Sequence, residues 1–330
     1  MALLPITICT GDYDRIRALS DGRIMVEGCD VNYLTMNPEQ VFYRAWNNHE
    51  FDVTEISGSS YILARSAGWE DYIAVPVFPS RMFRHSGIYI RTDSGIKSPK
   101  DLKGQKIGVP VYAMTAAVWI RGMLGDDYGV FPSDLQWLTG GLEEGGRKPK
   151  FTPNLPPEIR VNNIPENKTL SNMLENGEIN ALISAREPSC FGSGNSDIVR
   201  LFPDFRSAEK EWFRRTGLFP IMHFLAIRKS LVEREPWLAT SILKAFTQAK
   251  DLSIKEMLDV TALSVSVPWI AAELRETRSL MGEDFWSYGF SENLQELTAM
   301  CRWSREQGIA AREMDPKELF HPATLDKPRI

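Results

Sequence analysis

The sequence predicts an α/β protein of two lobes with helices at its C-terminal end. Short β-rich runs alternate with helical patterns along the first two thirds of the chain, which is typical of sheets with helices on both faces. Two crossings, near Arg91–Ser94 and near Arg200–Pro203, divide these elements into two groups. The chain has 330 residues, 43% hydrophobic and 25% charged, which is enough for two lobes of about 100–200 residues each. We therefore expect one lobe from residues 1–91 plus 203–330, and a second lobe from residues 92–202.

The first lobe is expected to contain a mostly parallel sheet, because its strands and helices alternate. Its strands are predicted at 4–10, 31–36, 53–56, 72–77 and 88–91. A helix is predicted to begin at Asn37-Pro38, since asparagine is a favoured N-cap and proline suits the first helical position.

The second lobe repeats this alternation around a helix at 113–124. Its strands are predicted at 105–109, 135–139, 159–162 and 179–184. After one more strand at 221–228 the chain is predicted to be helical almost to its end. In that part Leu238, Ile242 and Phe246 fall at helical spacing and form a stripe that faces the core.

The composition argues against several classes of function. A net charge of −5 and a pI near 5.6 argue against a protein that binds nucleic acid. No apolar run approaches the ~18–20 residues of a membrane span. The N-terminus lacks the basic start, long apolar stretch and cleavage site of an export signal, which predicts a cytoplasmic protein. The four cysteines are scattered without metal-ligand spacing, so we expect reduced thiols and no metal site.

Several motifs resemble known proteins. Residues 98–109 (SPKDLKGQKIGV) resemble the entry to the second lobe of type II periplasmic-binding-protein folds. Five further segments resemble the 4,5-dihydroxyphthalate decarboxylase family, at 51–57, 73–86, 135–147, 182–188 and 200–204. The segment 73–86 (IAVPVFPSRMFRHS) is the most specific of these, and the resemblance extends over nearly the whole chain.

This resemblance implies a two-lobed periplasmic-binding-protein-like fold that carries a cytoplasmic carboxy-lyase. The implied reaction removes one carboxylate from 4,5-dihydroxyphthalate and gives protocatechuate. The implied partner is therefore a small aromatic dicarboxylate, and a homo-oligomer is compatible with the chain. Such scaffolds host many functions. The main alternative is a solute-binding protein for an organic anion, and another is an enzyme or sensor with a different substrate.

Two arginines and a histidine lie between two predicted strands, at Arg81, Arg84 and His85. Arginine forks bind carboxylates in a bidentate manner, so the arginines are candidate substrate clamps. The other interpretation is that they are surface residues paired with acids. Because His85 neighbours them, it is the candidate general acid. His223, within an apolar strand, is a second candidate for the site or a histidine of the core.

Further candidates follow strand ends, where ligands of open α/β sheets bind. Glu55 is a candidate proton relay or a capping or ion-pairing acid, and Ser57 and Ser59 are candidate substrate contacts or N-caps. Tyr112 and Thr115 precede or open a helix, whose N-terminus attracts anions. They are therefore candidate contacts for a substrate carboxylate, or residues that only cap the helix.

Arg186, after the strand at 179–184, is a further candidate clamp. The sequence has no recognisable Schiff-base lysine motif, phosphate-binding loop or metal-ligand spacing. We therefore expect acid–base chemistry without a cofactor.

Overall fold

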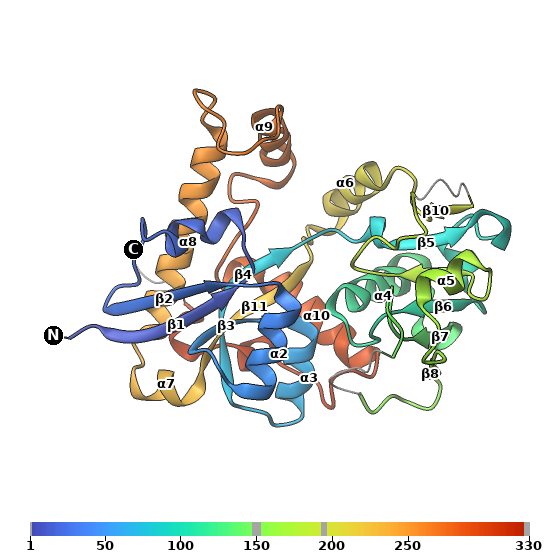
Figure 1. Cartoon of the computed structure of the whole chain (residues 1–330), viewed down its shortest axis with the longest axis horizontal. Coiled ribbons are helices and arrows are strands. Elements are labelled where there is room, and N and C mark those ends of the chain that lie inside the picture. Colours follow the sequence, from blue (N-terminus) through green and yellow to red (C-terminus); the bar gives the residue numbers. More distant parts are fainter. Residues whose placement is uncertain (1, 147–152, 193–196, 327–330) are drawn as a thin grey trace.

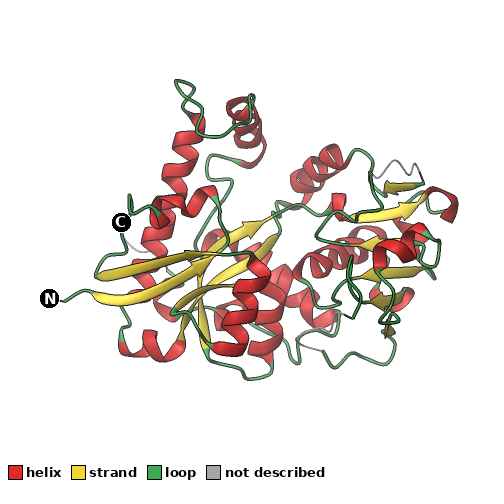
Figure 2. Ribbon diagram, viewed as in Figure 1, coloured by secondary structure: helices red, strands yellow, loops and turns green. Residues whose placement is uncertain are grey.

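The computed structural model describes residues 2–146, 153–192 and 197–326, and the chain forms two sheets that lie side by side with helices around each (Figures 1 and 2). The family-like segment 135–147 therefore ends on a residue, Arg147, that lies outside the described ranges.

The first sheet has the strand order β2-β1-β3-β11-β4. Its strands are β1 (Leu4–Thr10), β2 (Cys29–Thr35), β3 (Val53–Ser57), β4 (Tyr72–Arg81) and β11 (Ile221–Arg228). Strand β1 is parallel to β2 and β3, whereas β11 lies between β3 and β4 and is antiparallel to both. The sheet is therefore mixed, because a strand from late in the chain returns into its middle. This return brings β11 against residues that are about 170 positions earlier in the sequence.

The second sheet has the strand order β10-β5-β9-β6-β7-β8. Its strands are β5 (Ile88–Arg91), β6 (Lys106–Val109), β7 (Gln136–Thr139), β8 (Val161–Asn163), β9 (Ala181–Ile183) and β10 (Ile198–Arg200). Strands β6 to β9 pair in parallel, and β5 is antiparallel to β9 and β10.

The pairing of β5 corrects one predicted boundary. The sequence assigns this strand to the first lobe, but its partners belong to the second sheet. The physical reason is the side-chain packing, since Tyr89 is buried in a cluster with Leu182 and Ile198. The first crossing therefore lies between Arg81 and Ile88, before the predicted Arg91–Ser94.

Ten α-helices lie in the described ranges. They are α1 (Arg17–Ser20), α2 (Pro38–Asn48), α3 (Gly58–Ser66), α4 (Thr115–Tyr128), α5 (Leu170–Glu175), α6 (Phe205–Thr216), α7 (Lys229–Arg234), α8 (Leu238–Leu258), α9 (Ile270–Met281) and α10 (Leu294–Glu306). The predicted start of α2 is confirmed, because the Asn37 side chain accepts a hydrogen bond from the Glu39 amide. None of these helices is long and apolar enough to cross a membrane.

The C-terminal helices pack against the first sheet and against helices that cover both sheets. Helix α8 packs against β4 and α1, and it projects with α9 from the side of the first sheet (Figure 1). Helix α10 packs against both α3 and α4, so it joins the helical layers of the two sheets. A glycine permits this approach, because a Cβ at Gly122 would lie 2.1 Å from the Trp303 ring. Trp119 and Trp303 then meet edge to face in one continuous core.

Candidate active site

A buried carboxylate and a histidine meet on neighbouring strands where the first sheet faces the second. Glu55 lies in β3 and His223 in β11, and they are diagonal neighbours because His223 is opposite Ser57 in the antiparallel register. The His223 Nδ1 and the Glu55 Oε1 are 2.5 Å apart. The Glu55 side chain is fully buried, whereas 19% of the His223 side chain is exposed. We refer to these two residues as the Glu55–His223 pair.

Two further donors hold the Glu55 carboxylate. The Gly11 amide donates to Oε2 at 2.7 Å, and the Tyr13 hydroxyl donates to Oε1 at 2.8 Å. Burial alone would raise the pKa of Glu55, but the charge and hydrogen bond of His223, together with these donors, hold that pKa below its usual value. Burial and the adjacent Glu55 also raise the pKa of Tyr13, which therefore stays a hydrogen-bond donor.

The ring of His223 is fixed on two sides. Nδ1 is held by Glu55, and Phe42 of α2 contacts the ring edge-on with centroids 4.9 Å apart. The other nitrogen, Nε2, makes no hydrogen bond to the described residues. A histidine held through Nδ1 by a carboxylate has a defined tautomer and an Nε2 that can exchange a proton. This is the arrangement of a general acid or base.

Three hydroxyl groups lie next to this pair, where the N-terminus of α3 meets the N-terminus of α4. Thr115, the first residue of α4, has its Oγ1 at 3.0 Å from the Oγ of both Ser57 and Ser59. The Ser59 amide donates to the same Thr115 oxygen, and the Ser59 hydroxyl donates to the Ala113 carbonyl. Ser57 stands at the N-cap of α3 but makes no capping bond with its side chain. The hydroxyls therefore link the N-termini of α3 and α4.

Arg84 lies beside the histidine strand, and the acid that acts on its charge, Glu209, is not within ion-pair distance. Its Nε donates to the Met222 sulfur at 3.2 Å, next to His223, and its Nη1 contacts the Ala185 carbonyl at 3.4 Å. No carboxylate of the described residues lies within ion-pair distance of its guanidinium. Burial lowers the pKa of Arg84 to about 10, so the side chain is still a cation at neutral pH.

Arg186 is exposed and forms an ion pair with Glu39 at the start of α2, at 3.2 Å. This pair links the loop after β9 with the helical layer of the first sheet. Because Glu39 already pairs with this guanidinium, a substrate carboxylate would have to compete with Glu39 for Arg186.

Both terminal nitrogens of Arg81 and the hydroxyl of Tyr112 make hydrogen bonds within the protein. The Arg81 guanidinium is buried and donates to the carbonyls of Phe219 and Ser287 and to the Asn293 side chain. It also lies 3.5 Å from Glu296. The hydroxyl of Tyr112 donates to the Gln307 carbonyl at 3.2 Å. These contacts fasten the C-terminal segment, and neither residue contacts the Glu55–His223 pair.

His85 lies in a separate aromatic environment. Its ring is 3% exposed and contacts Phe202 and Trp212 edge to face. Its Nδ1 is 3.9 Å from Glu209 and has no hydrogen-bond partner in the described part of the chain. Burial lowers the pKa of His85 to about 4 and raises that of Glu209 to about 7. No hydrogen bond or ring contact in the described ranges joins His85 to Glu55 or His223.

Replacing Glu209 by glutamine tests this environment. The folded-state pKa of Glu209 is raised, so its contribution to stability is present below its unfolded pKa near 4.5 and is lost as pH rises through about 7. The lowered pKa of His85 acts in the opposite sense and loses stability as pH falls from about 6.5 to about 4. Thermal melts should show that the stability of E209Q relative to the parent increases between pH 5.5 and pH 8, by about 2 kcal/mol. An E209Q protein that melts below the parent throughout this range would instead indicate a charged His85–Glu209 pair.

Gly11, Tyr13 and Phe42 are not among the site residues predicted from the sequence. The first two follow the carboxyl end of β1, so the strand-end argument applied to Glu55 and Thr115 could have found them. Phe42 carries no such signal, because a helical aromatic residue is usually a core residue. In the described ranges, no group of three or more His, Cys, Asp and Glu side chains is placed to hold a metal ion.

Comparison with known proteins adds two kinds of likeness. A family model described as NMT1/THI5 like matches residues 25–143. The periplasmic aliphatic sulphonate binding protein SsuA from Escherichia coli is similar in structure, with a TM-score of 0.51, 13% identity and coverage of 97% of this chain and 98% of that one. A crystal structure of a protein from Archaeoglobus fulgidus also has a TM-score of 0.51, with 15% identity over 92% of this chain and 98% of its own. These structures confirm the two-lobed periplasmic-binding-protein-like fold.

Two curated relatives share much more of the sequence. A protein of Comamonas testosteroni, named 4,5-dihydroxyphthalate decarboxylase, is 45% identical over 330 residues, which is the full length of both chains. A protein of Pseudomonas putida with the same name is 47% identical over 214 residues, which cover 65% of this chain and 83% of the relative. Identity at this level along the entire chain confirms the resemblance inferred from the motifs, and the chain belongs to the 4,5-dihydroxyphthalate decarboxylase family.

Proposed function

We propose that this protein converts 4,5-dihydroxyphthalate to protocatechuate and CO2, with the Glu55–His223 pair handling the proton. The 45% identity to a full-length relative with that name supports the reaction. The contact of 2.5 Å between Glu55 and His223, which holds the histidine through Nδ1, is the observation that supports the assignment of roles.

The chemistry requires a proton at the carbon that loses its carboxylate. Each carboxylate of the substrate is para to one hydroxyl, so release of the phenolic proton moves negative charge to the carbon that bears the carboxylate. A general acid protonates that carbon, CO2 leaves with the C–C bond broken, and the ring becomes aromatic again. Each turnover consumes one proton from solvent, because a carboxylate is replaced by hydrogen.

His223 is the group that we assign to this proton transfer. Its Nε2 makes no hydrogen bond to the described residues, and Glu55 stabilises the imidazolium that forms when the ring takes up a proton. This assignment moves the acid role from His85, which the sequence favoured, to His223. The reason is that Glu55 contacts His223, whereas His85 packs among Phe202 and Trp212.

Arg84 is the side chain that we assign to a substrate carboxylate. It is half-buried beside Met222 and has no acid of the described residues within ion-pair distance. The hydroxyls of Ser57 and Thr115 lie at the same contact between the sheets, and the Ser59 hydroxyl, which donates to the Ala113 carbonyl, lies beside them. We propose that they orient the second carboxylate.

Arg84→Ala should raise KM by about 10–150-fold and change kcat little. A hydrogen bond to a charged group contributes about 1.5–3 kcal/mol, and a contact made equally to ground state and transition state affects KM alone. Arg186→Ala is the matched control, because Glu39 already pairs with that guanidinium. The measurement is the KM of both variants from steady-state kinetics. A larger increase in KM for Arg186→Ala than for Arg84→Ala would assign the carboxylate contact to Arg186.

The reaction itself is tested by incubating the purified protein with 4,5-dihydroxyphthalate and following protocatechuate by chromatography. We expect turnover with EDTA present and no added cofactor. Activity that is lost in EDTA and restored by one divalent ion would refute the cofactor-free route. Tight binding of the substrate without any turnover would favour a solute-binding protein.

A further inference from the structure

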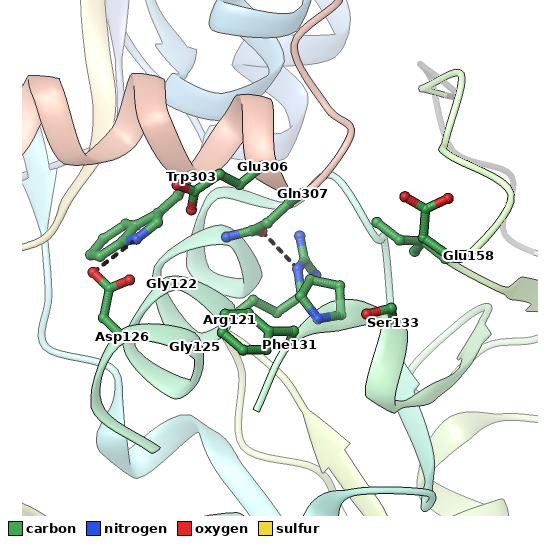
Figure 3. Close-up of a pocket in the computed structure, with 12 residues that line it drawn as sticks. Arg121, Gly122, Gly125, Asp126, Phe131, Ser133, Glu158, Trp303, Glu306 and Gln307 are labelled. Carbon is green, nitrogen blue, oxygen red and sulfur yellow. Dashed lines mark hydrogen bonds between the residues drawn. The ribbon is translucent and has the colours of Figure 1, made fainter. Parts of the chain in front are cut away.

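A cavity lies between α4 and α10, and neither Glu55 nor His223 lines it. It has a volume of about 220 Å³ and lies along the C-terminal half of α4, whereas Thr115 stands at the N-terminus of that helix (Figure 3). It is lined by residues of α4, of the segment 131–133, of the segment 158–159 and of α10 with Gln307.

A buried guanidinium with one unused donor group faces this cavity. Arg121 is only 2% exposed, its Nε donates to the Gln307 side chain at 2.8 Å, and its Nη2 donates to the Tyr112 carbonyl at 2.7 Å. Its Nη1 has no hydrogen-bond partner in the described ranges. Figure 3 shows the Arg121 guanidinium beside Gln307, to which it donates, with Glu158 apart from it among the other lining residues.

The charge of Arg121 is also without a counter-ion among the described residues. Its guanidinium lies over the Tyr112 ring at 4.0 Å and near the Trp137 ring at 5.3 Å, which offsets part of the cost of burying a cation. Buried charges are nevertheless normally paired with an opposite charge, and buried donors normally have acceptors. An unpaired cation with an unused donor beside a cavity is the arrangement that a small anion would complete.

We propose that this cavity binds a small monocarboxylate with an apolar or aromatic body. The carboxylate would accept from Arg121 Nη1, after a small displacement of the side chains that now cover that nitrogen. Phe131, Pro132, Ile159 and Trp303 supply apolar surface for the rest of the molecule. A volume of about 220 Å³ is below the ~300–1,000 Å³ of pockets for drug-sized ligands, so the occupant is small.

The acids around the cavity explain why we specify one negative charge. Asp126 and Glu306 both pair with Arg302, so their charges are already compensated. Glu158 is exposed at the edge and has no ion pair with a described residue. A second carboxylate on the ligand would lie near this charge and be repelled. The cavity should therefore prefer a monocarboxylate, whereas the candidate active site takes a dicarboxylate.

The test is a calorimetric titration with benzoate in an Arg84→Ala background, which weakens carboxylate binding at the candidate active site. We expect saturable binding of benzoate, at least tenfold weaker binding of phthalate, and no binding of the uncharged analogue benzamide. Protocatechuate, titrated in the same way, distinguishes a site for the reaction product from one for monocarboxylates in general.

A blocking substitution locates the binding. Ser133 is exposed at the cavity, so Ser133→Trp should fill its mouth and abolish benzoate binding without disturbing the buried Arg121. Asn154→Trp, at an exposed position outside the lining, is the matched control and should bind as before. Arg121→Met should also abolish binding, provided that a thermal melt shows a folded protein. Absence of benzoate binding, or binding that survives Ser133→Trp, would overturn the proposal, and neither result depends on decarboxylase activity.

Discussion

His223→Asn is expected to lower kcat by about 10²–10⁴-fold, with a much smaller change in KM. A general acid contributes a factor of this size to the transition state, and its loss appears in kcat. Asparagine retains a side-chain donor close to the position of Nδ1, so the buried Glu55 carboxylate keeps a partner while the proton-exchanging nitrogen is removed. The measurement is steady-state kinetics with 4,5-dihydroxyphthalate, alongside a thermal melt to confirm folding.

His85→Asn is the matched control for this experiment, because His85 is the other histidine that the sequence offers as a site residue. Its ring contacts Phe202 and Trp212, so we expect a lower melting temperature and a kcat within a few-fold of the parent. The opposite pattern, with kcat lost in His85→Asn and kept in His223→Asn, would return the acid role to His85.

Arg81→Met is expected to destabilise the folded protein by about 3–5 kcal/mol. This is the typical cost of removing one partner of a buried ion pair. The guanidinium of Arg81 donates hydrogen bonds to the Phe219 and Ser287 carbonyls and to the Asn293 side chain, and it pairs with the Glu296 carboxylate. Its removal leaves each of these buried acceptors without that donor. Chemical denaturation measures the change in the free energy of unfolding.

Arg84→Met separates this structural role from substrate binding. Both variants remove a guanidinium from the same family-like segment. Among the described residues, however, Arg84 donates only to the Met222 sulfur and, at 3.4 Å, to the Ala185 carbonyl. We expect Arg84→Met to unfold at nearly the parent's denaturant concentration. If Arg81→Met folds with near-parent stability and an increased KM, Arg81 contacts the substrate, as the sequence predicted.

Most strands could be predicted from the sequence because each is a short apolar or alternating run between turn residues. The boundary at β5 could not, because Ile88–Arg91 is equally apolar whichever sheet it joins. Its place depends on pairing with β9 and β10, which lie about 90–110 residues later. The antiparallel insertion of β11 between β3 and β4 could not be predicted either, because the local sequence pattern of a strand does not show which strands it pairs with.

The same limit applies to the candidate site. Glu55, Ser57 and Thr115 follow strand ends in the sequence, and the structure brings them close together. The choice between the histidines rested on the arginines next to His85 in the sequence. That signal does not report tertiary contacts, whereas the pairing of Glu55 with His223 spans 168 positions and depends on β11 entering the first sheet.

The most direct test of the Glu55–His223 pair is a double-mutant cycle on kcat with Glu55→Gln, His223→Asn and the combined variant. Residues that act as one catalytic unit have strongly non-additive effects. We predict that the double variant is about as slow as His223→Asn alone, since Glu55 acts only through the histidine. Rate losses that multiply in the double variant, or a Glu55→Gln enzyme as fast as the parent, would contradict a joint role of the two residues in proton transfer.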